Sequence, residues 1–180
     1  KKKKSPNAGL PQAVKTLENE KKGQGRLEQV KLASGEVLLV EAGALERPMP
    51  RVSNRMLILS PFDNSVIQRE RLKSLFQYDY QIECYVPASK RQYGYFSLPL
   101  LYRDQFIGRM DCKAHRKERL LEIKSLYFEP HSFDDDQIVT AFTEALKTFS
   151  QFQGCDRVSL TEAYPKPMEQ RLRSAISHQF

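Results

Sequence analysis

The sequence is poor in several features that would assign a function class at once. Its three cysteines, Cys84, Cys112 and Cys155, are odd in number and far apart, which excludes a disulfide framework and fits reduced thiols. No apolar run approaches the roughly 20 residues of a membrane span, and no apolar segment follows the opening KKKKSPN as in a signal peptide. Glycine is scarce, and neither a phosphate-binding loop nor a Gly-x-Ser-x-Gly turn is present. We therefore expect a cytoplasmic chain without membrane contact and without the chemistry of those two motifs.

Positive charge is present instead, and it is unevenly distributed. The net charge is +7. Residues 1–60 carry 12 Lys/Arg against 6 acids, residues 61–132 carry 12 against 9, and residues 133–180 carry 5 against 7. A basic front and an acidic end favour a polyanionic partner, for which nucleic acid is the usual candidate.

The first third of the chain is predicted to be a helix followed by a hairpin. Leu10, Val14 and Leu17 keep helical spacing, Pro11 suits the first turn, and Ser34-Gly35 separates two apolar runs as a hairpin turn does. A helix that leads directly into a two-stranded hairpin is how a winged-helix domain ends. Residues 1–45 are therefore interpreted as a recognition helix and wing whose earlier helices precede this chain, and residues 46–56 as a connector.

Residues 57–180 are predicted to form one winged-helix-like domain, which makes the fold class α+β. Strands are predicted at 57–60, 79–86 and 158–164 and, as a three-stranded meander, at 95–104, 105–115 and 119–130. Helices are predicted at 69–77, 132–153 and 167–176. Asp134, Asp135 and Asp136 suit the first turn of the long helix. Asp63 and Asn64 are expected to fix a turn through hydrogen bonds to the backbone.

The stretch RMDCKAHRK, residues 109–117, contains side chains suited to metal binding, catalysis or phosphate contact. Because a strand alternates its faces, one face is predicted to carry Phe106, Gly108, Met110, Cys112 and Ala114, and the other Ile107, Arg109, Asp111, Lys113 and His115. Cys112 and His115 then point in opposite directions. We therefore expect neither a metal site nor a cofactor here.

The charged face has two interpretations that the residue types leave open. In the first, it contacts DNA phosphates, with Asp111 holding the neighbouring cations and with help from the flanking turn, loop and short helix; the candidates are Arg109, Lys113, His115, Arg116, Lys117, Lys90, Arg91, Arg69 and Arg71. Tyr93 and Tyr95 could stack on bases. In the second, it is a solvated strand face whose internal ion pairs contribute little.

Four longer motifs stand in one order along the chain: LSPFDN from Leu59, R-x-R-L-x-x-L-F-x-x-D-Y from Arg69, K-R-x-Y-G-Y from Lys90 and G-R-x-D-x-K-x-x-R-K from Gly108. Together they resemble the C-terminal half of the YcaQ/AlkZ-type winged-helix DNA glycosylases of bacteria. The resemblance is strongest over residues 57–130.

The resemblance implies that the full-length protein removes alkylated bases from DNA, including both ends of interstrand crosslinks, by hydrolysing the N-glycosidic bond. In this family a Gln-x-Gln or Gln-x-Asp motif near the N-terminus positions water, and an N7-alkylguanine is already cationic and leaves readily. Gln151-Phe152-Gln153 has these letters but closes an amphipathic helix, with Phe152 on its apolar face. We therefore expect the catalytic residues upstream of Lys1 and a fragment that is inactive alone.

Double-stranded DNA is the implied partner, bound through its backbone by a monomer at the nucleoid of a bacterial cytoplasm. Two other functions remain open on the residues themselves. One is a non-catalytic winged-helix DNA-binding module or regulator, and the other is an interaction domain whose charges only solubilise it.

Overall fold

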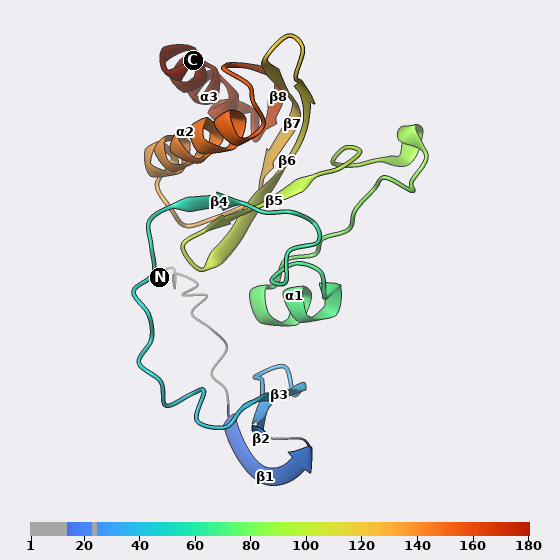
Figure 1. The fold of residues 1–180 in the computed structure, drawn as a ribbon, viewed down its shortest axis with the longest axis vertical. Coiled ribbons are helices and arrows are strands. Elements are labelled where there is room, and N and C mark those ends of the chain that lie inside the picture. Colours follow the sequence, from blue (N-terminus) through green and yellow to red (C-terminus); the bar gives the residue numbers. More distant parts are fainter. Residues whose placement is uncertain (1–13, 23–24) are drawn as a thin grey trace, which may run out of the picture. The chain divides into compact units, whose positions relative to one another are not determined.

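The computed structural model describes residues 14–22 and 25–180 (Figure 1). The fold is α+β, as predicted, with one three-stranded and one five-stranded sheet among the described residues. Its internal contacts divide the chain into two units. The first unit comprises residues 1–51 and 70–78, and the second comprises residues 52–69 and 79–180. The domain boundaries expected from the sequence stay a prediction.

The first unit contains an antiparallel sheet of order β1-β2-β3, formed by Val14–Lys22, Gly25–Lys31 and Val37–Glu41. The predicted hairpin is confirmed: Gly35 N–H donates to the Leu32 carbonyl at 2.9 Å, and the φ of Gly35 is +89°. That backbone conformation is one that glycine adopts without steric cost.

The predicted helix is wrong over Val14–Lys22, which forms β1, while Leu10 and Pro11 lie outside the described residues. The helical spacing rested on three apolar residues, a weak signal. β1 pairs with β2 in an antiparallel backbone ladder. Such pairing readily overrides a weak local preference for helix. The short helix predicted at 69–77 is confirmed as α1, Arg69–Phe76, on which Leu72 is fully buried.

The second unit contains a sheet of order β4-β5-β6-β7-β8. The predicted meander is confirmed as β5 (Leu98–Tyr102), β6 (Gln105–His115) and β7 (Leu120–Phe128), with β4 (Met56–Ile58) antiparallel at one edge. At the other edge β8 (Arg157–Tyr164) runs parallel to β7. A parallel pair requires a long crossover connection, and α2 (Asp135–Phe152) provides it.

Helices α2 and α3 (Lys166–Gln179) cover the same face of this sheet (Figure 1). The core between them is apolar, and its fully buried members include Met110, Leu121, Ile123, Leu126, Phe142, Leu146 and Leu172. Asp135 and Asp136 lie in the first turn of α2, as predicted, whereas Asp134 precedes the helix and caps it by accepting hydrogen bonds from the N–H groups of Asp136 and Gln137.

The pairing of β6 has two irregularities, one opposite β7 and one opposite β5, and the second changes which side chains of β6 face the core. Pairing passes from Asp111 opposite Ser125 to Cys112 opposite Ile123, so Lys124 is an extra residue on β7. Met110, Cys112 and Ala114 share the core side, as predicted. At the other end, Leu100 lies opposite Gly108 and Leu101 opposite Phe106. The extra residue there is Ile107, which joins the core while Phe106 does not, so the predicted faces of these two residues are wrong.

Candidate nucleic-acid interface

The face of the sheet opposite α2 and α3 carries the charged residues of β6, and the segment 79–97 covers the part of it that holds Arg109 and Asp111. The strand predicted at 79–86 is wrong: the segment has no strand, and its one regular element is η1, Ala88–Lys90. The charged residues of β6 therefore fall into two groups. Arg109 and Asp111 lie beneath the segment, with 3% and 5% exposure, whereas Lys113 is exposed and His115 is half-buried.

Arg109 is held inside the protein by three different contacts. Its Nη2 donates to the Glu129 Oε1 at 2.5 Å and to the Asp79 carbonyl at 3.2 Å. Its guanidinium carbon lies 4.0 Å from the centre of the Tyr93 ring, a cation–π geometry. The solvent-facing position predicted for Arg109 is therefore wrong. The alternation was right, but another part of the chain covers that face.

Asp111 also differs from the prediction, because its partners are backbone groups. Oδ2 accepts the Tyr95 N–H at 2.8 Å, and Oδ1 accepts the Phe96 N–H at 3.2 Å. A Cβ added at Gly94 would lie 2.3 Å from the Asp111 Oδ2, and the φ of Gly94 is +125°. Glycine at position 94 is therefore needed both for its backbone conformation and for the close approach of this carboxylate.

Like Asp111, Glu83 binds backbone N–H groups of the segment 79–97 through its carboxylate, and the sequence did not identify it. Its carboxylate accepts three consecutive N–H groups, from Gln92, Tyr93 and Gly94, at distances between 2.7 and 3.1 Å. The available signal was a single acid preceding a Tyr-Gly turn by ten residues. That signal is weak, because nothing local in the sequence links the two.

The β6–β7 turn holds the accessible part of the predicted basic cluster. Lys113, Arg116 and Lys117 are exposed. Arg116 donates to the Gln153 Oε1 at 3.0 Å. His115 Nε2 and Glu122 Oε2 lie 2.9 Å apart, and this hydrogen bond is the main cause that lowers the pKa of Glu122. The lysines are therefore the side chains at this turn best placed to meet a ligand.

The other predicted DNA-binding cations also differ in how accessible they are to a ligand. Arg69 donates to the carbonyls of Val66 and Pro61, at 2.5 and 2.9 Å, and so is bound to its own turn. Lys90 is exposed, and Arg91 is half-buried over the Tyr95 ring. Arg71 is half-buried on α1.

The predicted role of Asp63 in its turn is confirmed, because its Oδ1 accepts the Ser65 N–H at 2.8 Å. The same role for Asn64, which is exposed, stays a prediction.

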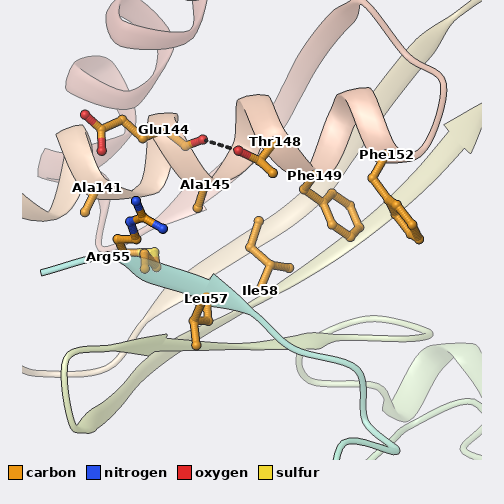
Figure 2. A pocket seen from close by; sticks show the side chains of 10 residues that line it. Arg55, Leu57, Ile58, Ala141, Glu144, Ala145, Thr148, Phe149 and Phe152 are labelled. Carbon is orange, nitrogen blue, oxygen red and sulfur yellow. Dashed lines mark hydrogen bonds between the residues drawn. The ribbon is translucent and has the colours of Figure 1, made fainter. Parts of the chain in front are cut away.

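Gln151-Phe152-Gln153 ends α2, as predicted: the Gln151 carbonyl accepts the Gly154 N–H at 3.0 Å. Phe152, however, is 83% exposed and is not on the buried face. It lines a groove of about 600 Å³ between β4 and α2, together with Leu57, Ile58 and Phe149 (Figure 2). The groove walls are largely apolar, and their charged members are Arg55 and Glu144.

The letters Gln-x-Asp also occur at Gln77-Tyr78-Asp79, a match that the sequence interpretation missed. Each residue has a place in the fold. The N–H of Gln77 donates to the Lys73 carbonyl, Tyr78 is 3% exposed, and the Asp79 carbonyl accepts from Arg109. These contacts of Gln77 and Asp79 are made by their backbone atoms, and both residues are exposed.

Two of the three cysteines, Cys112 and Cys155, are shielded by the fold. Burial raises the pKa of the Cys112 thiol to about 12, so this group stays protonated near neutral pH. Cys155 is buried as well. In the part of the chain that the structure describes, no group of three His, Cys, Asp or Glu side chains could hold a metal ion.

Comparison with known proteins identifies the family. The family model described as "DNA glycosylase AlkZ-like" matches residues 8–152, which are 145 of the 180 residues. The chain therefore belongs to the AlkZ-like DNA glycosylase family, and the predicted relationship is confirmed. No solved structure matches the chain. Among the described residues, no helix is both long and apolar enough to cross a membrane.

Proposed function

We propose that the second unit holds double-stranded DNA by its phosphate backbone for an enzyme that excises alkylated bases, including the two ends of interstrand crosslinks, by N-glycosidic hydrolysis. The family match over residues 8–152 carries this proposal. The exposed lysines of the β6–β7 turn support it. The protein acts as a monomer at the nucleoid of the bacterial cytoplasm.

The phosphate contacts are assigned to the accessible cations. Lys113 and Lys117 lie on or beside the β6–β7 turn, Lys90 lies on the segment that covers the sheet, and all three are exposed. Arg116 and His115 have protein partners and border this surface. Arg69 and Arg109 are assigned the support of the fold, because their guanidinium groups are already bound to carbonyl or carboxylate groups.

The chemistry is assigned to residues other than the two Gln-x-Gln/Asp matches described above. The backbone of both matches takes part in local hydrogen bonds, and we propose that the 180-residue chain binds DNA without releasing bases. An N7-alkylguanine carries a positive charge, and its departure needs mainly a positioned water and stabilisation of charge at the sugar.

The test compares the natural full-length protein with the 180-residue chain on a duplex that contains one N7-methylguanine. Base release is read as strand cleavage at the resulting abasic site after alkali treatment. Release by the full-length protein alone is the expected result. Release by neither protein would reject the enzymatic assignment, and release by the short chain would show that its own residues suffice.

Binding is tested with the double substitution Lys113→Ala/Lys117→Ala against Lys147→Ala, an exposed lysine on α2. Each lost phosphate contact lowers the slope of log affinity against log salt by about 0.9. The double variant should therefore lose about 2 from this slope, and the control should lose none. Sequence-selective binding that survives high salt, without base release from any form, would identify a regulator instead.

A further inference from the structure

Among the large hydrophobic side chains of the described residues, that of Tyr85 is the most exposed, at 92%. It lies on the loop 83–95, which the figure shows projecting away from the sheet before β5 (Figure 1). Tyr95, at 54% exposure, belongs to the same loop. We infer that this loop is a second nucleic-acid contact, which stacks its tyrosine rings on unpaired bases. The inference rests on the proposed function, since it takes DNA as the ligand.

The two sides of the loop are tied together without a strand ladder. On one side, the Val86 N–H donates to the Glu83 carbonyl at 2.9 Å and closes the turn that carries Tyr85. The Glu83 carboxylate reaches across to the N–H groups of residues 92–94. In return, the Arg91 Nε donates to the Val86 carbonyl at 2.9 Å. The turn with Tyr85 is therefore fixed to the side that leads to Tyr95.

The base of the loop is fixed to the sheet. Asp111 on β6 binds the N–H groups of Tyr95 and Phe96. The Tyr80 hydroxyl donates to the Ser97 carbonyl at 2.5 Å, and the Ser97 hydroxyl donates to the Tyr93 carbonyl at 3.1 Å. Since both ends and the middle are held, the exposed rings project from an ordered support, which lowers the entropy cost of stacking.

The tip of the loop combines aromatic rings with positive charge. Lys90 is exposed within η1, and the Arg91 guanidinium lies 4.9 Å from the centre of the Tyr95 ring. The acid inside the loop, Glu83, directs its carboxylate at three N–H groups. The loop therefore presents rings and cations outward, which is the combination that binds single-stranded nucleic acid through stacking and phosphate attraction.

The chemistry of the ligand follows from what a ring can reach. Bases inside an intact duplex already stack on their neighbours and offer no free face. An enzyme that acts on a base must take it out of the stack. Removing a base from the stack leaves its partner base unpaired and leaves a gap in the stack of the DNA duplex. The rings of Tyr85 and Tyr95 can stack on bases at such a distorted site, whereas paired DNA offers them no free face.

The experiment measures affinity by fluorescence anisotropy for a paired duplex and for the same duplex with a short single-stranded gap. The variant is Tyr85→Ala/Tyr95→Ala, and the matched control is Tyr164→Ala, a partly exposed tyrosine of β8 outside the loop. The affinity of the loop variant should fall about tenfold or more for gapped DNA and less than twofold for paired DNA. Its slope of log affinity against log salt should stay unchanged. Glu83→Gln, which keeps both rings but weakens their support, should lose the preference for gapped DNA in part.

The outcomes separate this inference from the proposed function. Wild-type protein that binds paired and gapped DNA equally would overturn the role of the loop and leave the proposed function intact. So would a loop variant that keeps its preference for gapped DNA. Wild-type protein that binds neither DNA would overturn both.

Discussion

The Arg109→Ala substitution should lower the stability of the second unit and leave the DNA affinity of the folded molecules unchanged. The Arg109 side chain is 4% exposed, and its partner Glu129 is 27% exposed. Removing one partner of a buried ion pair typically costs about 3–5 kcal/mol. Because Glu129 retains some contact with water, we expect the lower end, about 3 kcal/mol. For a chain of this size that corresponds to a fall of about 6–12 °C in Tm.

Thermal unfolding followed by circular dichroism measures this change, and DNA affinity is then determined well below the Tm of each variant. Lys113→Ala is the matched control on the same strand and should change stability by less than about 0.5 kcal/mol. The double variant Arg109→Met/Glu129→Gln should recover part of the loss, because it leaves no buried charge unpaired. An Arg109→Ala protein with unchanged Tm and tenfold weaker DNA binding would refute the structural role.

Three further predictions concern other sites in the second unit. Gly94→Ala should destabilise the protein by about 1–3 kcal/mol in chemical denaturation, because its Cβ would collide with Asp111. Cys112 should resist iodoacetamide at pH 8 in the native protein, as read by mass spectrometry, because burial raises its pKa to about 12. Hydrogen bonds from Lys166, Arg173 and the Ala163 N–H, in that order, lower the pKa of Glu169 to about 2, so its stabilisation should be present above about pH 4.5 and lost as pH falls toward 2.

Each of these has a control and a contradicting result. Gly154 also has a positive φ, +75° against +125° at Gly94, but no atom lies within 4 Å of a Cβ added there; equal losses for Gly154→Ala and Gly94→Ala would refute the clash. Cys84 and Cys112 are both half-buried, so alkylation of Cys112 as fast as that of Cys84 would contradict the argument from the raised pKa of Cys112. Glu169→Gln should flatten the acid limb of the stability profile relative to Glu144→Gln, and parallel profiles would contradict its role.

The sequence predicted those parts of the second unit whose structure depends on local patterns. The meander and α2 follow from period-2 or period-3.6 repeats and from caps such as Asp134. The alternation of β6 correctly separated Cys112 from His115. What alternation could not show is which face another part of the chain covers.

Segment 79–97 is the main failure and has a physical cause. Residues 79–86 alternate in polarity as a strand does, but their neighbours do not bind them through a ladder. Remote carboxylates bind the backbone instead: Glu83 holds N–H groups nine to eleven residues away, and Asp111 holds two others fifteen and sixteen residues away. No single-sequence pattern signals such bonds. The exposed or buried state of Arg109 depended on them.

The order of elements along the chain also determines how the second unit can assemble during synthesis. The apolar face of β5, β6 and β7 is complete when residue 128 has formed, but α2 and α3, which cover it, follow at residues 135–152 and 166–179. β8, the parallel edge, is added only after the α2 crossover. A nascent chain therefore exposes an apolar sheet surface until α3 has been synthesised, so a chain that stops before residue 166 would keep this surface exposed and would tend to aggregate.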